Sequence, residues 1–136
     1  MPASTTSVVL DASVAVRAVA DRRQDALEWF RRVWAQEVNA MWPQLAYAEI
    51  ANGLATLVRA GQLEPGAADA GLAYTLRAPI ESASLELLAE PALAVALTRS
   101  VSVYDACYIV LAEAAGAALV TADRRLAEAT EIAVLI

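Results

Sequence analysis

Four acidic residues lie in apolar surroundings, where carboxylates are uncommon. Asp11 follows the run Ser-Val-Val-Leu, and Asp123 follows the run Ala-Ala-Leu-Val-Thr-Ala. Glu49 lies within Leu-Ala-Tyr-Ala-Glu-Ile-Ala-Asn, and Asp105 precedes Ala-Cys-Tyr-Ile-Val-Leu. A carboxylate that is removed from water is costly unless it is paired or coordinates a metal ion. Because the chain contains neither His nor Lys, the available partners are Arg and a metal cation.

Four carboxylates that meet at one point repel one another, and a hard divalent cation that prefers oxygen ligands neutralises them. A Mg²⁺ or Mn²⁺ site is therefore the leading hypothesis, provided that the fold brings the four acids together. Such an ion lowers the pKa of bound water and stabilises negative charge that develops during hydrolysis, so no His is required as a general base. We favour Asp11 and Asp105 as direct ligands, with Glu49 and Asp123 acting through water or orienting the nucleophile.

Each acid also has a simpler explanation. Asp11 and Asp123 could be helix N-caps, a common role for Asp. Glu49 and Asp105 could face solvent on amphipathic helices. Taken one at a time, these explanations are as good as the functional one, and only the placement of all four together favours the metal site.

Alternating strands and helices are expected to position these acids. The short β-branched or apolar runs predict strands at residues 7–10, 38–41, 79–82, 117–120 and 132–135. The helical patterns cover residues 13–20, 25–36, 43–60, 65–76, 85–98, 103–115 and 124–129. We expect Pro43 in the first turn of its helix, and we expect Pro91 to break or kink the helix that Ser84 caps. The alternation predicts one α/β domain with a parallel sheet over residues 1–136.

A parallel sheet explains how the four acids could meet. Ligands bind outside the carboxyl ends of the strands in such sheets. Asp11 stands at the end of the first predicted strand, and Asp123 stands just past the strand at 117–120. If these two strands are parallel neighbours, both acids face the same edge. Glu49 lies within its predicted helix, and Asp105 lies in the first turn of another.

The composition limits the class of protein. The chain has 136 residues, of which 59% are apolar, and one Cys, so it forms no internal disulfide. No uncharged apolar stretch is long enough to span a membrane, and the start Met-Pro-Ala-Ser-Thr-Thr-Ser has no signal-peptide pattern, so we expect a cytoplasmic protein. The apolar excess, with Trp29, Trp34 and Trp42 on or beside helices, predicts a surface that another chain covers.

The charge pattern bears on nucleic-acid binding. The net charge of −6 argues against strong nonspecific binding to a polyanion. All ten cationic side chains are Arg, whose planar fork binds two phosphate oxygens at once. Arg124 and Arg125 follow Asp123 directly, and Arg17 lies close beyond Asp11, so these three are the candidate RNA-binding residues. The alternative, that the Arg pair only solvates its short helix, stays open.

The ordered motifs resemble those of PIN-domain ribonucleases, most closely the VapC toxins of bacterial toxin–antitoxin pairs. The motifs are Val-Val-Leu-Asp-Ala-Ser, Pro-Gln-Leu-Ala-Tyr-Ala-Glu-Ile-Ala-Asn, Ser-Val-Tyr-Asp-Ala-Cys-Tyr and Leu-Val-Thr-Ala-Asp-Arg-Arg-Leu. They extend over essentially the whole chain in the family's order, and the four acidic positions all match. The resemblance implies a three-layer α/β/α sandwich with a central parallel sheet.

The resemblance also implies an activity and partners. Mg²⁺ or Mn²⁺ would be held by Asp11, Glu49, Asp105 and Asp123, and the residues that match supporting positions of the family are Ser13, Asn52 and Thr121. Members are metal-dependent endoribonuclease toxins that typically form homodimers. A cognate VapB antitoxin, whose tail occupies the active-site groove, silences them.

Other classes that use acids at strand ends match the chain poorly. A phosphoacceptor receiver domain needs an activating Lys, which is missing. A haloacid-dehalogenase-like phosphatase needs a second Asp two residues after the first, where this chain has Ser13. A P-loop NTPase needs a Gly-rich loop with Lys. The remaining alternative is a PIN-like scaffold that binds a protein partner or RNA without cleaving it.

Overall fold

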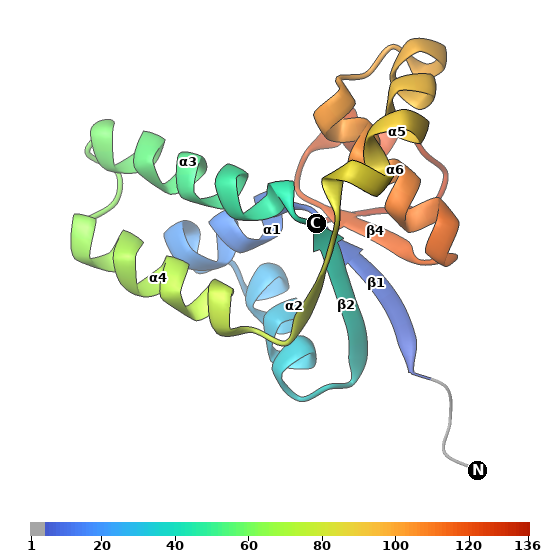
Figure 1. The fold of residues 1–136 in the computed structure, drawn as a ribbon. Helices are drawn as coiled ribbons and strands as arrows, with labels where there is room; N and C mark the ends of the chain where they lie inside the picture. The colour runs from blue at the N-terminus through green and yellow to red at the C-terminus, as the bar shows by residue number, and fades with distance from the viewer. Residues whose placement is uncertain (1–4) are drawn as a thin grey trace.

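Five short strands form the central sheet of the computed structural model, which describes residues 5–136 (Figure 1). The strands are β1 Thr6–Leu10, β2 Val38–Pro43, β3 Ile80–Ala83, β4 Ala118–Thr121 and β5 Ala133–Leu135. All neighbouring pairs are parallel, and the order across the sheet is β3-β2-β1-β4-β5. The chain builds outward from β1 in one direction and then returns to its other side, so the topological switch point lies between β1 and β4. The first four residues, part of the segment in which we find no signal-peptide pattern, lie outside the described residues.

Helices cover both faces of this sheet. They are α1 Ala12–Val16, η1 Arg17–Asp21, α2 Gln24–Trp34, α3 Leu45–Arg59, α4 Pro65–Arg77, α5 Leu85–Arg99, α6 Val103–Ala115 and α7 Arg124–Glu128. In Figure 1, α1 to α4 lie on one side of the sheet, and α5 and α6 lie on the other. The predicted α/β architecture with a parallel sheet between helical layers is confirmed.

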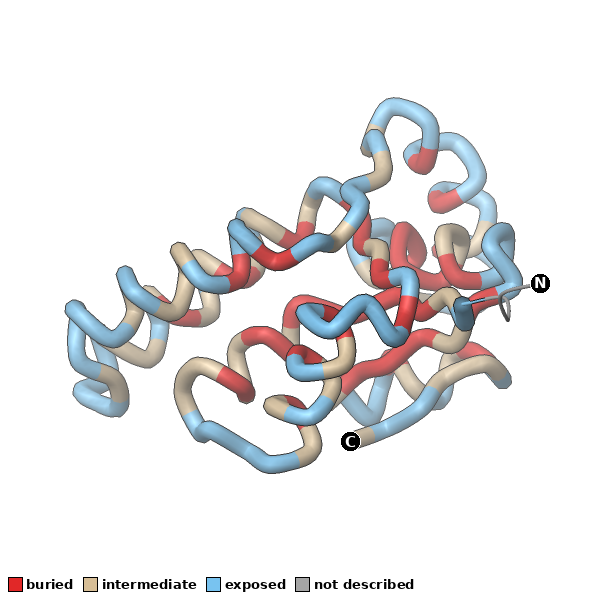
Figure 2. Tube along the Cα trace, turned by 90° about the horizontal axis from the view of Figure 1, so that it is seen from below, coloured by how far each residue is buried: buried red, intermediate tan, exposed pale blue. Residues whose placement is uncertain are grey.

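The core follows from which faces carry apolar residues. Val8, Val9 and Leu10 of β1 are almost completely buried, the continuous apolar run expected of a parallel strand that is covered on both faces. Phe30 and Val33 form part of the buried stripe of α2. Figure 2 shows the buried positions concentrated in the sheet and on the inner sides of the helices, whereas the far ends of the α3–α4 pair are exposed or intermediate.

The structure contradicts the prediction that Pro43 lies in the first turn of a helix and the prediction that Pro91 breaks one. Pro43 is the last residue of β2, paired with Ala83, and α3 begins only at Leu45. A strand end tolerates Pro because the missing N–H removes few ladder bonds, and the N–H of Gln44 restores the link by donating to the carbonyl of Ala83 at 2.8 Å. Pro91 does not divide its helix, since α5 runs unbroken from Leu85 to Arg99. The carbonyl that Pro91 leaves without a helical partner belongs to Leu87, which is 80% exposed, so water can bind it.

The predicted helix at 13–20 is also divided. The chain forms α1 over five residues and then the π-helical turn η1, which ends at Arg22 in the left-handed conformation with φ of 47°. Two glycines allow other helices to approach this region closely. A Cβ on Gly53 of α3 would lie 2.9 Å from Cγ2 of Val16, and a Cβ on Gly71 of α4 would overlap with Val19.

Among the helices of residues 5–136, none is by itself long and apolar enough to cross a membrane. The pair α5 and α6 passes by length and composition only when taken together, and the two helices meet at a bend of 108°.

The contact between α4 and η1 predicts the effect of two glycine substitutions in the same helix. Gly71→Ala should lower the free energy of unfolding by about 1 to 3 kcal/mol, because the added methyl group displaces Val19. Gly66→Ala is the matched control, since its Cβ meets nothing within 4 Å, and it should leave stability unchanged or raise it by about 0.4 to 1 kcal/mol. Urea denaturation measures both. Val19→Ala should restore part of the loss in Gly71→Ala, and equal stability of the two glycine variants would contradict the close contact.

Candidate metal centre

The four predicted acids border one hollow of about 450 Å³ at the carboxyl edge of the sheet. Asp11 follows β1, and Asp123 follows β4 after one intervening residue. The two strands are parallel neighbours, and the N–H of Asp11 donates to the carbonyl of Val120 at 2.9 Å. Glu49 reaches the hollow from α3, and Asp105 reaches it from the first turn of α6. The hollow therefore lies at the switch point of the sheet, where ligands bind in folds of this kind.

Two hydroxyl groups hold the carboxylate of Asp11. Its Oδ2 accepts a hydrogen bond of 2.6 Å from Ser13 Oγ and one of 2.8 Å from Thr121 Oγ1. The same hydroxyls accept the N–H groups of Ala122 and Asp123, both at 2.9 Å, so they also tie the loop after β4 to Asp11. Asp11 is only 8% exposed. Since the bonds to its side chain all converge on Oδ2, Oδ1 has no hydrogen-bond partner within residues 5–136 and stays available for a ligand.

Glu49 is held from the opposite helix. The hydroxyl of Tyr108, on α6, donates to Glu49 Oε1 at 2.7 Å across the two helices. Tyr108 is buried and lies three residues after Asp105, so both point from the same side of α6 toward the acids. Sequence reasoning missed this tyrosine. Its signal was the spacing: a hydroxyl-bearing side chain three positions from an acid, within an otherwise apolar helix.

The N-cap explanation fits one acid and not the other. Asp123 does cap α7, because its Oδ1 accepts the N–H groups of Arg125 at 2.9 Å and Leu126 at 3.4 Å. Asp11 occupies the N-cap position of α1 but makes no capping hydrogen bond with its side chain. The cap of α6 is Ser102, whose hydroxyl accepts the N–H of Asp105 at 3.0 Å.

The electrostatics of the hollow favour a cation. Burial raises the pKa of Asp11, and the neighbouring charges of Asp105 and Asp123 raise it further, against the two hydroxyl bonds that lower it. Burial also raises the pKa of Glu49, with added repulsion from Asp11 and Asp105. For Asp105, burial and then Asp123 raise the pKa, while Arg125 lowers it. Each of these carboxylates is thus disfavoured in its charged form, and a positive ion among them would relieve the repulsion.

The donor set suits a hydrated ion rather than a closed cage. Within the described residues, no three acidic or cysteine side chains are close enough together to hold one ion among them. Mg²⁺ usually keeps several water ligands and takes only one or two carboxylates from the protein. Asp11, with its free Oδ1, and Asp105 are candidates for such a pair, since both line the hollow. The oxygen donors present therefore suit a Mg²⁺- or Mn²⁺-type ion, and Glu49 and Asp123 line the same hollow.

Only some of the other residues predicted for the site line the acidic hollow. Arg17 lines the hollow, as predicted from its position after Asp11. Arg125 lines an adjacent hollow that shares Asp105, whereas Arg124 lines neither of the two. Asn52 is exposed and does not line the acidic hollow, and its backbone carbonyl accepts the hydroxyl of Thr56 at 2.9 Å.

Asp21 is a fifth acidic residue on the hollow, and sequence reasoning missed it. It ends η1, whose π-helical turn begins at Arg17, so both residues reach the hollow from one short segment. The spacing could have predicted this placement, because Asp21 follows Arg17 by four residues, and side chains at that spacing lie on one side of a helical segment.

The family model for the PIN domain matches residues 8–132. The chain belongs to the PIN-domain family. It is 37% identical over 125 residues to Ribonuclease VapC3 of Pyrobaculum aerophilum, an alignment that covers 89% of this chain and 92% of that protein.

Solved structures of PIN-like fold agree with this assignment. The crystal structure of PAE2754 from Pyrobaculum aerophilum superposes with a TM-score of 0.72 at 27% identity, covering 95% of this chain and 83% of that one. A toxin–antitoxin complex from Klebsiella pneumoniae gives a TM-score of 0.65 at 13% identity, with 93% and 95% of the two chains covered, and shows likeness of fold alone.

The raised pKa of Asp11 predicts how stability responds to pH. The folded protein without metal should lose stability as the pH rises from the ordinary value of 3.8 through the raised pKa of the folded state, because the buried carboxyl then ionises at a cost. Asp11→Asn keeps an oxygen for the two hydroxyl bonds and removes the charge. In EDTA, this variant should therefore be more stable than wild type at pH 7, and its advantage should shrink as the pH falls. Thermal melting across pH 4 to 8 measures the difference, and a lower melting temperature of Asp11→Asn at pH 7 would contradict the electrostatic cost.

Proposed function

We propose that this PIN-domain protein is a VapC-type toxin, an endoribonuclease that hydrolyses RNA phosphodiester bonds with Mg²⁺ or Mn²⁺ and is neutralised by an antitoxin. The observation that carries the proposal is the gathering of Asp11, Glu49, Asp105 and Asp123 on one hollow at the switch point. The relation to Ribonuclease VapC3 of Pyrobaculum aerophilum supports the reaction class.

Within this proposal, the chain's own residues have separate roles. Asp11 and Asp105 would hold the ion, and the hydroxyls of Ser13 and Thr121 fix the orientation of Asp11. When bound, the metal would supply an activated water and stabilise negative charge on the phosphodiester. Glu49, fixed by Tyr108, keeps a carboxylate at the rim that can accept a proton from the attacking water.

Arg17 is the cation of the acidic hollow that can contact the RNA backbone. It lies on η1 and borders the same hollow as the four acids. Its guanidinium suits a phosphate because two N–H groups can bind two oxygens. Contacts of this kind position RNA without reading its sequence, so they leave the identity of the target RNA open.

The alternative is a scaffold that binds a partner or RNA without cleavage. The two functions differ in what the ion does. A scaffold needs no metal for RNA binding, whereas the enzyme loses its reaction when the ion or its ligand is removed. The acidic hollow favours the enzyme, since mutually repelling carboxylates are costly in a surface that only binds.

Metal dependence tests the proposed function directly. The purified protein should cut single-stranded RNA in Mg²⁺ or Mn²⁺ and not in EDTA, and the products should carry 5′-phosphates. Asp11→Asn should reduce the rate by ~100-fold or more, since the ion contributes several kcal/mol of transition-state stabilisation. Saturating metal should raise the melting temperature of wild type but not of Asp11→Asn. RNA cleavage that persists in EDTA, or that survives in Asp11→Asn, would argue for a contaminating nuclease and against this site.

An apolar groove beside the acidic hollow suits the antitoxin. The groove has a volume of about 490 Å³ and is lined by apolar side chains of η1, α2 and α4, among them Val19, Leu27 and Tyr74. Next to it, Trp34 packs against Tyr74 with ring centroids 5.5 Å apart and the rings tilted by 39°, and Trp34 is 40% exposed. Of the three tryptophans predicted to mark a partner surface, Trp42 is instead buried in the core.

One segment, η1, borders both the groove and the acids. Val19 lines the groove, while Arg17 and Asp21 line the acidic hollow. An antitoxin helix in the groove could therefore extend a tail over η1 into the hollow. The hollow carries five carboxylates against one guanidinium, so a basic tail is the best match.

The exposed side of α5 is the proposed surface of a homodimer. Leu87 and Leu97 are 80% and 75% exposed, and Leu93, which lies four residues before Leu97 on its side of the helix, is 53% exposed. Exposed leucines gathered in this way mark surfaces that another chain covers.

Charge placed on α5 should separate the dimer. Wild type should be a dimer by light scattering. Leu97→Arg should be a monomer that still unfolds cooperatively, because the substituted side chain is exposed in each subunit. Leu76→Arg on α4 is the matched control, because Leu76 is 53% exposed and lies on a different helix, and it should leave the dimer intact. A monomeric wild type, or a dimer unaffected by Leu97→Arg, would place any self-association elsewhere.

A further inference from the structure

A second hollow adjoins the acidic one. Its volume is about 220 Å³, and it shares Asp105 with the acidic hollow. The other charged residues that line it are Arg99, Arg125 and Glu128. The surface thus continues from the four acids past Asp105 toward α7 and the end of α5, which gives an extended ligand a direction in which to leave the acids.

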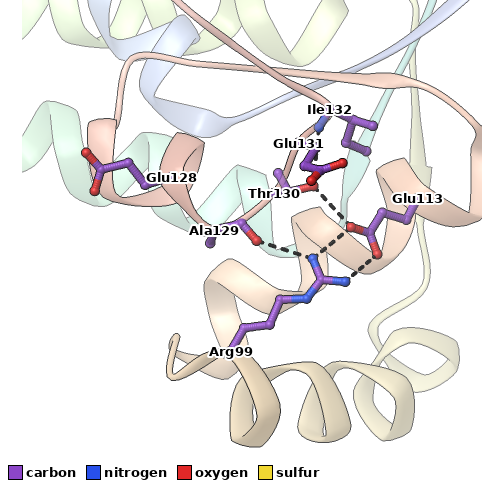
Figure 3. A pocket seen from close by; sticks show the side chains of 7 residues that line it. All are labelled: Arg99, Glu113, Glu128, Ala129, Thr130, Glu131 and Ile132. Carbon is purple, nitrogen blue, oxygen red and sulfur yellow. Dashed lines mark hydrogen bonds and ion pairs between the residues drawn. The ribbon is translucent and has the colours of Figure 1, made fainter.

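The two arginines of the second hollow differ in whether an acidic side chain of the protein pairs with the guanidinium. Figure 3 shows Arg99 pointing from α5 to Glu113 on α6. Its guanidinium donates to the two carboxylate oxygens of Glu113 at 2.7 and 2.9 Å and to the carbonyl of Ala129 at 3.2 Å. Thr130 donates to the same carboxylate at 3.0 Å. Arg99 is therefore a fixed and neutralised part of the wall.

Arg125 is different. Within residues 5–136 it forms no ion pair, and its side chain is exposed. Its backbone is fixed at the first turn of α7, where its N–H donates to Asp123. Its backbone is therefore held beside Asp123, and its guanidinium lines the second hollow, where it can bind an anion.

Beyond the second hollow the surface becomes unfavourable for a polyanion. A third hollow, drawn in Figure 3, is lined by Glu113, Glu128 and Glu131, and its single cation is the paired Arg99. Phosphate groups would be repelled there. The stretch that can accept phosphates is therefore short and ends near Arg125.

From this arrangement we infer that Arg125 binds the RNA phosphate that flanks the scissile one, and so directs the strand from the acids into the second hollow. The inference rests on the proposed ribonuclease function and adds a strand path and a phosphate subsite to it. It also separates two adjacent arginines, since Arg124 lines neither hollow.

The carboxylate of Asp105 does not oppose this binding once a divalent ion balances its charge. Glu128 is the other acid that lines the second hollow, and in Figure 3 its side chain points away from the Arg99–Glu113 pair.

Salt dependence of RNA binding tests the subsite. A fluorescent single-stranded RNA with hydrolysis-resistant phosphorothioate linkages is titrated with the wild-type protein in Mg²⁺ at several salt concentrations, so that the metal ligands stay intact and the RNA is bound but not cut. Arg125→Ala should weaken binding and reduce the slope of log K against log salt by about 0.7, the share of one phosphate contact on a single strand. Arg124→Ala should leave both quantities unchanged. Arg125→Lys should keep the slope, because the charge remains.

The outcomes separate this inference from the proposed function. If the two alanine variants show equal slopes and affinities, the flanking phosphate is not bound by Arg125, even where wild type cuts RNA in a metal-dependent way. If wild type neither binds nor cuts RNA, the proposed function fails and the subsite fails with it. Metal-induced stabilisation of Arg125→Ala with Asp11 intact should remain, which shows that the loss of affinity does not come from a damaged metal site.

Discussion

The carboxylate of Asp11 is the group on which the rest of the site depends. It lies nearly buried at the switch point, where only two hydroxyl groups and a hollow surround it. Those hydroxyls come from α1 and from the end of β4, so the two halves of the sheet must be in register for Asp11 to be held. The same hydroxyls receive the N–H groups of the following loop, which carries Asp123. A single hydrogen-bond network thus couples the topology of the sheet to the placement of two acids.

This arrangement has an energetic cost in the free protein. Three carboxylates with raised pKa values share a hollow with two further acids, and no Lys or His is present to balance them. Proteins commonly tolerate such unfavourable groups where a ligand later compensates for them. The neighbouring regions offset the cost with ordinary packing: the buried run of β1, the apolar inner stripes of α2 and α6, and the paired Arg99 and Glu113.

Much of this could be predicted from the sequence, and the errors have physical reasons. Short apolar runs alternating with helices predicted the parallel sheet, and the four ordered motifs predicted the PIN-domain family; both are confirmed. The roles of Pro43 and Pro91 could not be predicted from their local preferences, because strand pairing with Ala83 and the hydration of an exposed carbonyl decide them. Tyr108 was missed because its partner Glu49 lies 59 residues away on another helix, so only the tertiary structure shows their hydrogen bond. Asp21 could have been predicted, because it follows Arg17 by four residues and side chains at that spacing share one side of a helical segment.

The position of η1 has a consequence for how this protein can diverge. The side chains of this five-residue segment line two different surfaces. Arg17 and Asp21 border the acidic hollow, whereas Ala18 and Val19 border the apolar groove. Changes at the groove positions can alter which partner fits without touching the charges at the acids. Gly71 is part of this fit, because Val19 occupies the space that a side chain at position 71 would need. Substitutions within one short segment can therefore reshape the apolar surface while the acidic residues of the hollow stay as they are.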